Sequence, residues 1–231
     1  MTDTALAAAI IITCGAAATQ SLTGFGFALV MVPLLSLVWD VKSAVVTSTL
    51  VGTATLLPLL FEVRRHVQIP RVAPLLVGSF AGIPAGIWLL GWIDAQALEI
   101  LVGVVVIASS LLLYLVPGLG RTPASTVPSL LVGALSGVLR ASTSMGGPPA
   151  VLYLIGSTKE VEAFRGTLLA FALPTSLVTI AGLAVVGRVT PDILQTGAIT
   201  LPALVAGLVV GARVRAVVRQ EVFRTIVLHT S

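Results

Sequence analysis

The chain has 231 residues, of which 57% are hydrophobic and only 10% are charged. Ordinary soluble domains carry about 25% charged residues, so this composition excludes a water-soluble protein and predicts an integral membrane protein. Lysine and arginine exceed aspartate and glutamate by 13 to 9. In a membrane protein such an excess reports topology, so we expect the lipid bilayer as the surrounding partner and no binding of nucleic acid.

Apolar segments follow one another along the whole chain and are separated by polar clusters. A helix needs about 20 apolar residues to cross roughly 30 Å of hydrocarbon, and several segments reach that length. We therefore expect an all-α polytopic membrane protein. The segments lie near 5–20, 25–39, 43–61, 72–92, 97–116, 129–141, 148–157, 163–186, 193–212 and 222–231.

Glycine-rich polar sequences interrupt the apolar pattern at corresponding places in the two halves of the chain. The first break runs over residues 19–26 and the second over residues 140–149, and Gly26 and Gly147 lie about 120 residues apart. Paired interruptions of this kind are typical of transporters whose helices separate near the bilayer midplane. The pieces beside each break are short, since about 16 residues rise only about 24 Å, so we expect re-entrant hairpins.

The order of segments in the second half repeats the order in the first half. Counting each hairpin as one helix predicts about eight transmembrane helices in two repeats, the first helix of each repeat being broken into a re-entrant hairpin. A hairpin followed by three spans crosses an odd number of times, which inverts the second repeat. The predicted boundaries are 1–117 for the first repeat, 118–128 for a cytoplasmic linker and 129–231 for a second repeat whose last helix is short.

Basic residues gather on one face of this predicted topology. The opposite face has only Lys42 and Arg188, while Arg140 lies in the second break. Cytoplasmic loops carry the excess of lysine and arginine, so we expect a multi-pass protein of the bacterial inner (plasma) membrane with both termini outside. The cytoplasmic face would carry Arg64, Arg65, Arg71, Arg121, Lys159, Arg165, Arg213, Arg215, Arg219 and Arg224.

The two breaks hold the residues that we expect to bind a substrate. A helix that begins within the membrane presents unpaired N–H groups and the positive end of its dipole, so two converging breaks suit a small anion. Hydroxyl and amide groups add donors, and glycines let a ligand approach the backbone. The predicted binding residues are Gln20, Ser21, Thr23, Gly24, Gly26, Arg140, Ser142, Thr143, Ser144, Gly146 and Gly147.

Arg140 is the most informative single residue, because a guanidinium group at membrane depth is costly and has an anion as its natural partner. The alternative is that it reaches the outer headgroups or pairs with a backbone carbonyl at the hairpin tip. Arg165 lines an inner entrance or is a topology charge. Glycines outside the breaks are expected to allow close helix packing only, namely Gly78, Gly82, Gly86, Gly207 and Gly211.

The remaining polar residues argue against several other functions. The nine acidic residues lie at or near segment ends, which disfavours a metal or sodium transporter, although Glu99 stays open as a proton-coupling group. The only histidines are His66 and His229, so neither a metal cluster nor an intramembrane Ser/His hydrolase has a plausible set of residues. We expect no enzyme activity, no metal and no bound cofactor.

Three features together resemble one known family. They are the sequence Gly24-Phe25-Gly26 followed by residues 32–35 (Val-Pro-Leu-Leu), the echo of this motif at residues 146–149 (Gly-Gly-Pro-Pro), and the four-segment repeat. Over essentially the whole chain, they resemble the TauE/SafE family of bacterial sulfite exporters. The resemblance implies an inverted-repeat permease that moves sulfite, organosulfonates or related small oxyanions by alternating access, usually as an exporter and without a bound cofactor.

Other functions fit the same sequence features. A passive anion channel is one, because no carboxylate is expected at mid-bilayer to couple transport to an ion gradient. A chromate-type permease is a second, and a membrane assembly subunit whose glycine-rich faces bind partner helices is a third. A homodimer is left open as an oligomeric state.

Overall fold

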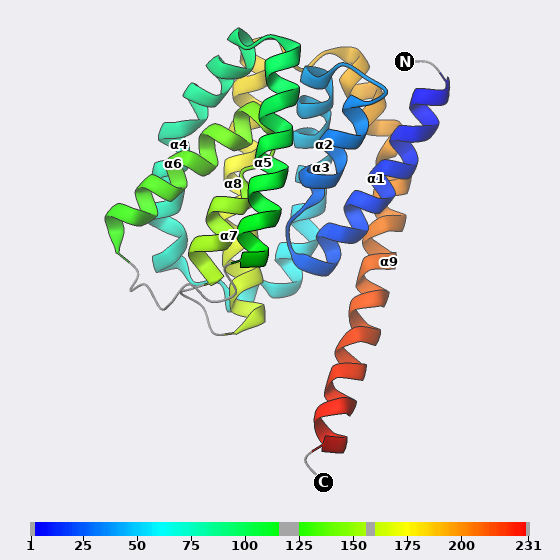
Figure 1. The fold of residues 1–231 in the computed structure, drawn as a ribbon, viewed down its shortest axis with the longest axis vertical. Coiled ribbons are helices and arrows are strands. Elements are labelled where there is room, and N and C mark those ends of the chain that lie inside the picture. Colours follow the sequence, from blue (N-terminus) through cyan, green and yellow to red (C-terminus); the bar gives the residue numbers. More distant parts are fainter. Residues whose placement is uncertain (1–2, 116–124, 156–159, 230–231) are drawn as a thin grey trace.

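The computed structural model describes residues 3–115, 125–155 and 160–229. Within these ranges the chain is helical and contains no strand, which confirms the all-α prediction (Figure 1). The elements are α1 (Asp3–Thr23), α2 (Phe27–Ser36), α3 (Val41–Val63), the short 3-10 turn η1 (Arg64–His66), α4 (Ile69–Trp92), α5 (Ala95–Leu115), α6 (Thr126–Thr143), α7 (Gly147–Ile155), α8 (Val161–Val185) and α9 (Pro191–His229).

Five helices in the described ranges are long and apolar enough to cross a membrane. They are α1, α3, α4, α8 and α9, and their apolar side chains are exposed over much of the outer surface. Such a surface is stable only against lipid, because exposed apolar area in water is unfavourable. The chain is therefore a multi-pass membrane protein, as its composition predicts.

The lengths of the helices beside the breaks agree only in part with the predicted short pieces. The helices α2 and α7 have 10 and 9 residues and are too short to span, as expected. The helix α1, however, has 21 residues and is long enough to cross the hydrocarbon. It begins at Asp3 and continues through polar residues of the first break as far as Thr23, so the estimate of 16 residues for this piece is wrong.

The prediction of a separate last segment near 222–231 is also wrong. The helix α9 continues without interruption from Pro191 to His229, because residues 212–221 contain neither glycine nor proline and are compatible with a helix. Figure 1 consequently places the N-terminus and the C-terminus at opposite ends of the molecule. The side of the membrane on which each terminus lies stays a prediction. The predicted linker falls mostly on 118–124, outside the described residues, and its last three positions belong to α6.

Three pairs of helices make the most extensive contacts, namely α4 with α6, α1 with α9, and α3 with α8. Glycines allow the first two pairs to approach closely. A Cβ atom on Gly82 of α4 would fall against the carbonyl oxygen of Ala134 in α6, and one on Gly207 of α9 would fall against the carbonyl oxygen of Cys14 in α1. The packing role predicted for Gly78, Gly82, Gly86, Gly207 and Gly211 is therefore confirmed.

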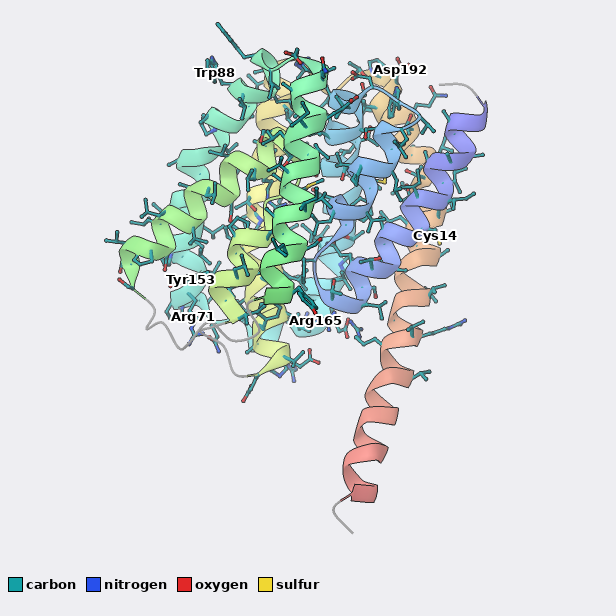
Figure 2. All side chains as sticks on the ribbon, in the orientation of Figure 1. Cys14, Arg71, Trp88, Tyr153, Arg165 and Asp192 are labelled. Carbon is teal, nitrogen blue, oxygen red and sulfur yellow. The ribbon has the colours of Figure 1, made fainter. Side chains whose placement is uncertain are left out.

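The two ends of the helical body differ in their side chains. Figure 2 places Arg71 and Arg165 near one end and Trp88 and Asp192 near the other. Trp88 stacks on Trp92 with ring centroids 5.4 Å apart, and Arg64 lies over the ring of Phe61. The predicted basic residues Arg121 and Lys159 lie outside the described residues, as do the side chains of Arg219 and Arg224.

Candidate functional site

The first break is a tight turn that only glycine forms without strain. Gly24 and Gly26 have φ angles of 85° and 98°, a left-handed conformation that a side chain disfavours. The N–H of Gly24 donates to the carbonyl of Gln20 at 2.8 Å and ends α1. Gly26 then lies immediately before the first residue of α2. The chain therefore reverses within three residues and starts a new helix inside the apolar body.

The second break repeats this geometry with different residues. The N–H of Ser144 donates to the carbonyl of Arg140 at 2.9 Å, so Gln20 and Arg140 occupy equivalent positions in the two turns. Ser144 has a φ angle of 66°, which costs a non-glycine residue roughly 1 kcal/mol. In both turns a threonine hydroxyl, that of Thr23 or of Thr143, accepts a hydrogen bond from the N–H two residues later, at 3.3 and 3.4 Å respectively.

One pocket brings the two breaks together. It has about 570 Å³ of empty space, including space that is open to the exterior. Its walls come from the first break and α2, from the second break and α7, and from the middle of α3 and α8. The lining residues are Gln20, Gly24, Phe25, Gly26, Phe27, Ala28, Leu29, Ser48, Thr49, Gly52, Thr53, Leu56, Arg140, Ser144, Met145, Gly147, Pro148, Leu168, Ala172 and Ser176.

About half of the predicted binding residues line this pocket. Those that do are Gln20, Gly24, Gly26, Arg140, Ser144 and Gly147. Those that do not are Ser21, Thr23, Ser142, Thr143 and Gly146.

The hydroxyl groups outside the pocket are occupied by the backbone. A hydroxyl has a single donor hydrogen. Ser21 donates its hydrogen to the carbonyl of Leu208 at 3.1 Å, and Thr23, Ser142 and Thr143 donate theirs to carbonyls four residues earlier at 2.7 to 2.9 Å. Gly146 packs against Arg140, since a Cβ atom there would lie 2.6 Å from the Cβ of Arg140. These residues shape the turns that carry the pocket.

Arg140 is the only ionisable residue among those that line the pocket. It is 9% exposed, and its Nη1 donates to the hydroxyl of Ser176 in α8 at 2.8 Å. Its Nε is buried without a hydrogen-bond partner, and within the described ranges no carboxylate forms an ion pair with it. This placement beside the pocket argues against the alternative in which Arg140 reaches the lipid headgroups. Arg140 is instead buried and lines the shared pocket.

The two short helices that start at the breaks offer different donors to this pocket. In α2 the side-chain oxygen of Gln20 accepts from the N–H of Phe27 at 3.1 Å, which leaves the N–H groups of Ala28 and Leu29 without partners inside the helix. In α7 the equivalent positions are Pro148 and Pro149, which have no N–H. The first break thus supplies backbone donors, and the second supplies the charge of Arg140.

Comparison with known protein families gives one match. A family model described as sulfite exporter TauE/SafE matches residues 9–230, which is nearly the whole chain. The chain belongs to the TauE/SafE family. This is a family of membrane transporters. Searches of curated proteins and of solved structures give no significant match.

Several residues of this TauE/SafE chain line the pocket although the breaks alone do not point to them. Ser144 donates to the hydroxyl of Ser48 in α3 at 3.3 Å, and Ser176 of α8 holds Arg140. Small polar residues in the middle of α3 and α8 are only a partial sequence signal, because Ser and Thr are also common where membrane helices pack together. Among the buried examples, Ser48, Thr49, Thr53 and Ser176 line the pocket, whereas Thr47, Thr55, Thr175 and Thr179 do not.

Acidic residues contribute nothing to the pocket walls. Asp40 and Asp94 accept hydrogen bonds from the N–H groups of Ser43 and Ala97 at the starts of α3 and α5, and Glu99 is exposed on α5. Within the described part of the chain, no group of three or more His, Cys, Asp or Glu residues is placed to hold a metal ion. The charge at the site is therefore positive, which favours an anionic ligand.

Proposed function

We propose that this protein is a secondary transporter that moves a small sulfur oxyanion, such as sulfite or an organosulfonate, across the bacterial inner membrane. The observation that carries the proposal is the buried Arg140 guanidinium, which lines the pocket and has only a serine hydroxyl as its hydrogen-bond partner. A buried charge is costly unless it is compensated, and an oxyanion in the pocket would supply the missing charge. Membership of the TauE/SafE family supports the same substrate class.

The donors around the pocket suit the oxygens of such an anion. The N–H groups of Ala28 and Leu29 belong to the first turn of α2, where the positive end of the helix dipole favours negative charge. Arg140 adds a charged donor from the opposite break. Ser48 and Ser144 also line the pocket, and their hydroxyls bond to each other at 3.3 Å. A ligand with several acceptor oxygens would be held from both halves of the chain at once.

Alternating access by two inverted repeats is the mechanism that we propose. The helix α1 packs on α9, and α6 packs on α4, so the first helix of each half contacts the second unbroken helix of the other half. This exchange is what a two-fold relation between the halves would produce. The central pair, α3 with α8, follows the same relation. Rocking of one half against the other would expose the pocket to each side in turn, with export as the usual direction in this family.

The first test is thermal stabilisation of the purified full-length protein by anions. Sulfite, sulfate, thiosulfate, chromate, taurine and sulfoacetate are added separately, because a ligand that binds only the folded state stabilises it by about 2.7 kcal/mol at 100 times its Kd. We expect a selective rise in melting temperature with one of the sulfur anions. Arg140→Gln should lose this rise, while Arg188→Gln, a charge-matched change away from the pocket, should keep it.

The outcomes separate the proposed transporter from the alternatives. No rise with any of the six anions, or an equal rise in Arg140→Gln, would contradict an anion site at the second break and favour a membrane assembly subunit. A rise with chromate alone would indicate a chromate-type permease. Accumulation of the stabilising anion against its gradient in proteoliposomes would establish transport, whereas strictly downhill flux would indicate a passive channel.

A further inference from the structure

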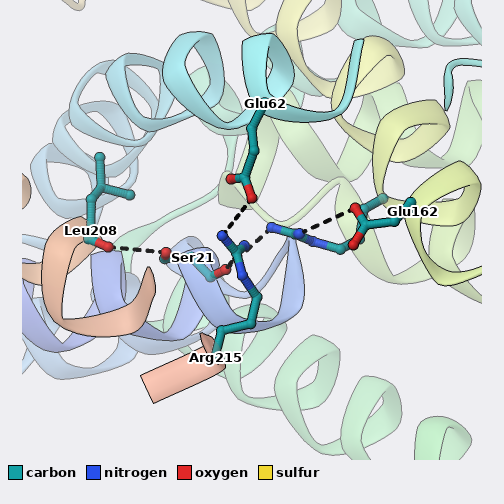
Figure 3. Close-up of polar contacts among 6 residues, drawn as sticks. Ser21, Glu62, Glu162, Leu208 and Arg215 are labelled. Atoms are coloured by element: carbon teal, nitrogen blue, oxygen red, sulfur yellow. Dashed lines mark hydrogen bonds and ion pairs between the residues drawn. The ribbon is translucent and has the colours of Figure 1, made fainter. Parts of the chain in front are cut away.

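Two arginines bind the end of α1 just before the first break. The carbonyl oxygen of Ser21 accepts from Arg215 Nη1 of α9 at 2.8 Å and from Arg165 Nη2 of α8 at 3.3 Å (Figure 3). Ser21 lies in the last turn of α1, whose carbonyls have no partner within the helix. Two guanidinium groups from different helices therefore converge on one neutral oxygen atom.

The positive charges in this cluster are only partly compensated. Arg215 Nη2 lies 2.7 Å from the carboxylate of Glu62 in α3, which makes a close ion pair at the edge of the protein. Arg165 is only 3% exposed, its contact with Glu162 is long at 3.8 Å, and its Nε is buried without a hydrogen-bond partner. Arg165 is thus a buried guanidinium that retains unused donor capacity.

Arg165 lies directly behind the wall of the pocket. A Cβ atom on Gly24 would lie 3.4 Å from Cγ and 3.5 Å from Nε of Arg165, so the unpartnered Nε faces the first break. Gly24 itself lines the pocket. Figure 2 places Arg165 near the end of the molecule that carries Arg71. The Arg165 guanidinium therefore lies between the pocket and the basic end.

We propose that Arg165 and Arg215 form a second anion site, at which an oxyanion displaces the Ser21 carbonyl as it passes between the pocket and the basic end of the molecule. This inference rests on the proposed transport of a sulfur oxyanion and adds a second binding step to it. The pair differs from Arg140 in that it holds the end of α1 while no anion is bound. Binding of an anion would release the end of α1, and with it the first break, from its hydrogen bonds to the two arginines.

An oxyanion would compete well for these two arginines. An oxyanion carries a full negative charge that the neutral Ser21 carbonyl lacks, and a guanidinium group binds two oxygens of one anion at once. Glu62 competes with the anion for Arg215, but its side chain is half-exposed, so breaking this ion pair costs little free energy. Exchange of the Ser21 carbonyl for an oxyanion is therefore favourable when an anion is present.

The test compares flux with binding in the full-length protein. Arg165→Gln, Arg215→Gln and Arg65→Gln are reconstituted in proteoliposomes, and 35S-labelled sulfite flux is measured beside the sulfite-induced rise in melting temperature. Arg65 is exposed near the same end and is the charge-matched control. We expect Arg165→Gln and Arg215→Gln to keep the rise, because Arg140 is intact, and to lose flux by on the order of tenfold or more. Arg65→Gln should keep both.

Glu62→Gln supplies a second variant that leaves both arginines in place. It removes the competitor for Arg215, so we expect it to bind sulfite at a lower concentration and to keep at least the wild-type flux. Normal flux in Arg165→Gln and Arg215→Gln would overturn the second site. Loss of the sulfite-induced rise together with flux in these variants would also overturn it, because the arginines would then act on the pocket or on folding.

These outcomes differ from a failure of the proposed function. If the wild-type protein neither binds nor moves any of the six anions, the transporter proposal falls and the second site falls with it. If the wild-type protein binds and moves sulfite and Arg140→Gln abolishes binding, the transporter proposal stands. The flux of Arg165→Gln and Arg215→Gln then decides the second site alone.

Discussion

Gln20 and Arg140 occupy the same position in two turns of similar geometry, yet they do different chemistry. Gln20 accepts from the N–H of Phe27 and so caps α2, whereas Arg140 donates to Ser176 and keeps Nε unpartnered. The difference follows from the residues after each turn, because Pro148 and Pro149 leave α7 with few N–H groups to be capped. The first break thus offers backbone N–H donors, and the second break offers the positive charge of Arg140.

The two neighbouring glycines of the second break predict opposite results when each is replaced by alanine. In Gly146→Ala the new Cβ would lie 2.6 Å from both the Cβ of Arg140 and the carbonyl oxygen of Ser136, so Arg140 must move. In Gly147→Ala the nearest atom is the Cβ of Phe25 at 3.8 Å, an ordinary contact. We expect Gly146→Ala to destabilise by about 1–3 kcal/mol and to weaken anion binding at least about tenfold.

Thermal unfolding with and without the stabilising anion measures both effects. Gly147→Ala is the matched control and should unfold within a few degrees of the wild-type protein, with anion affinity changed less than in Gly146→Ala. Equal loss of affinity in the two variants would mean that the position of Arg140 does not govern binding. Normal anion binding in Gly146→Ala would also mean that the position of Arg140 does not govern binding.

The sequence locates the two breaks but not which of their hydroxyls are available. Ser142, Thr143 and Ser144 are consecutive and look alike as donors, yet only Ser144 lines the pocket. Ser142 and Thr143 lie within α6, and their hydroxyls donate to carbonyls four residues earlier. Ser144 follows the last residue of α6 and has a left-handed backbone conformation. This distinction depends on where α6 ends, and a difference of one residue in a helix boundary reverses it.

At the scale of helices, glycine has a second and different use. In the contact between α4 and α6, glycines on both helices lie against carbonyl oxygens of the partner. Gly78 and Gly82 face Leu130 and Ala134, and Gly137 of α6 faces Ser79. Such close approach of two backbones allows extensive van der Waals contact. This contact stabilises helix pairs in lipid, where the hydrophobic effect does not drive helices together.

Substitution in this contact should destabilise the protein without touching the pocket. In Gly82→Ala the added methyl group would meet the backbone carbonyl of Ala134, which cannot move aside as a flexible side chain can. We expect a loss of about 1–3 kcal/mol, seen as a lower melting temperature in detergent. Gly103→Ala in α5 is the control, since nothing lies within 4 Å of its Cβ position, and it should be neutral or slightly stabilising.

Equal melting temperatures for Gly82→Ala and Gly103→Ala would contradict a tight contact between α4 and α6. The packing glycines could be predicted because their spacing of four residues marks one helix face. The extents of α1 and α9 could not be predicted equally well. Hydropathy falls at polar residues such as those near Thr19 and Arg213, but helices continue through polar residues when no glycine or proline stops them.

At the scale of the whole molecule, the charges along the transport path are unevenly placed. Arg165 lies toward one end of the helical body (Figure 2), and Arg215, which pairs with Glu62, binds the same Ser21 carbonyl as Arg165, whereas Arg140 is buried in the wall of the pocket. Residues of the first break line the pocket, and the Arg165 side chain lies against Gly24 of that break. An anion therefore meets attractive charge from the basic end inward, and the orientation of that end decides from which side it is collected.

We predict that the basic end faces the cytoplasm, because cytoplasmic ends of membrane helices carry the excess of arginine and lysine. Single cysteines are introduced as Arg65→Cys in η1 and Gln96→Cys in the first turn of α5, both exposed, in a Cys14→Ser background that removes the only native cysteine. A membrane-impermeant maleimide should label Gln96→Cys in intact bacterial cells and Arg65→Cys only after the inner membrane is permeabilised. The reverse pattern would place the basic end outside, and the second arginine site would then meet departing rather than incoming anions during export.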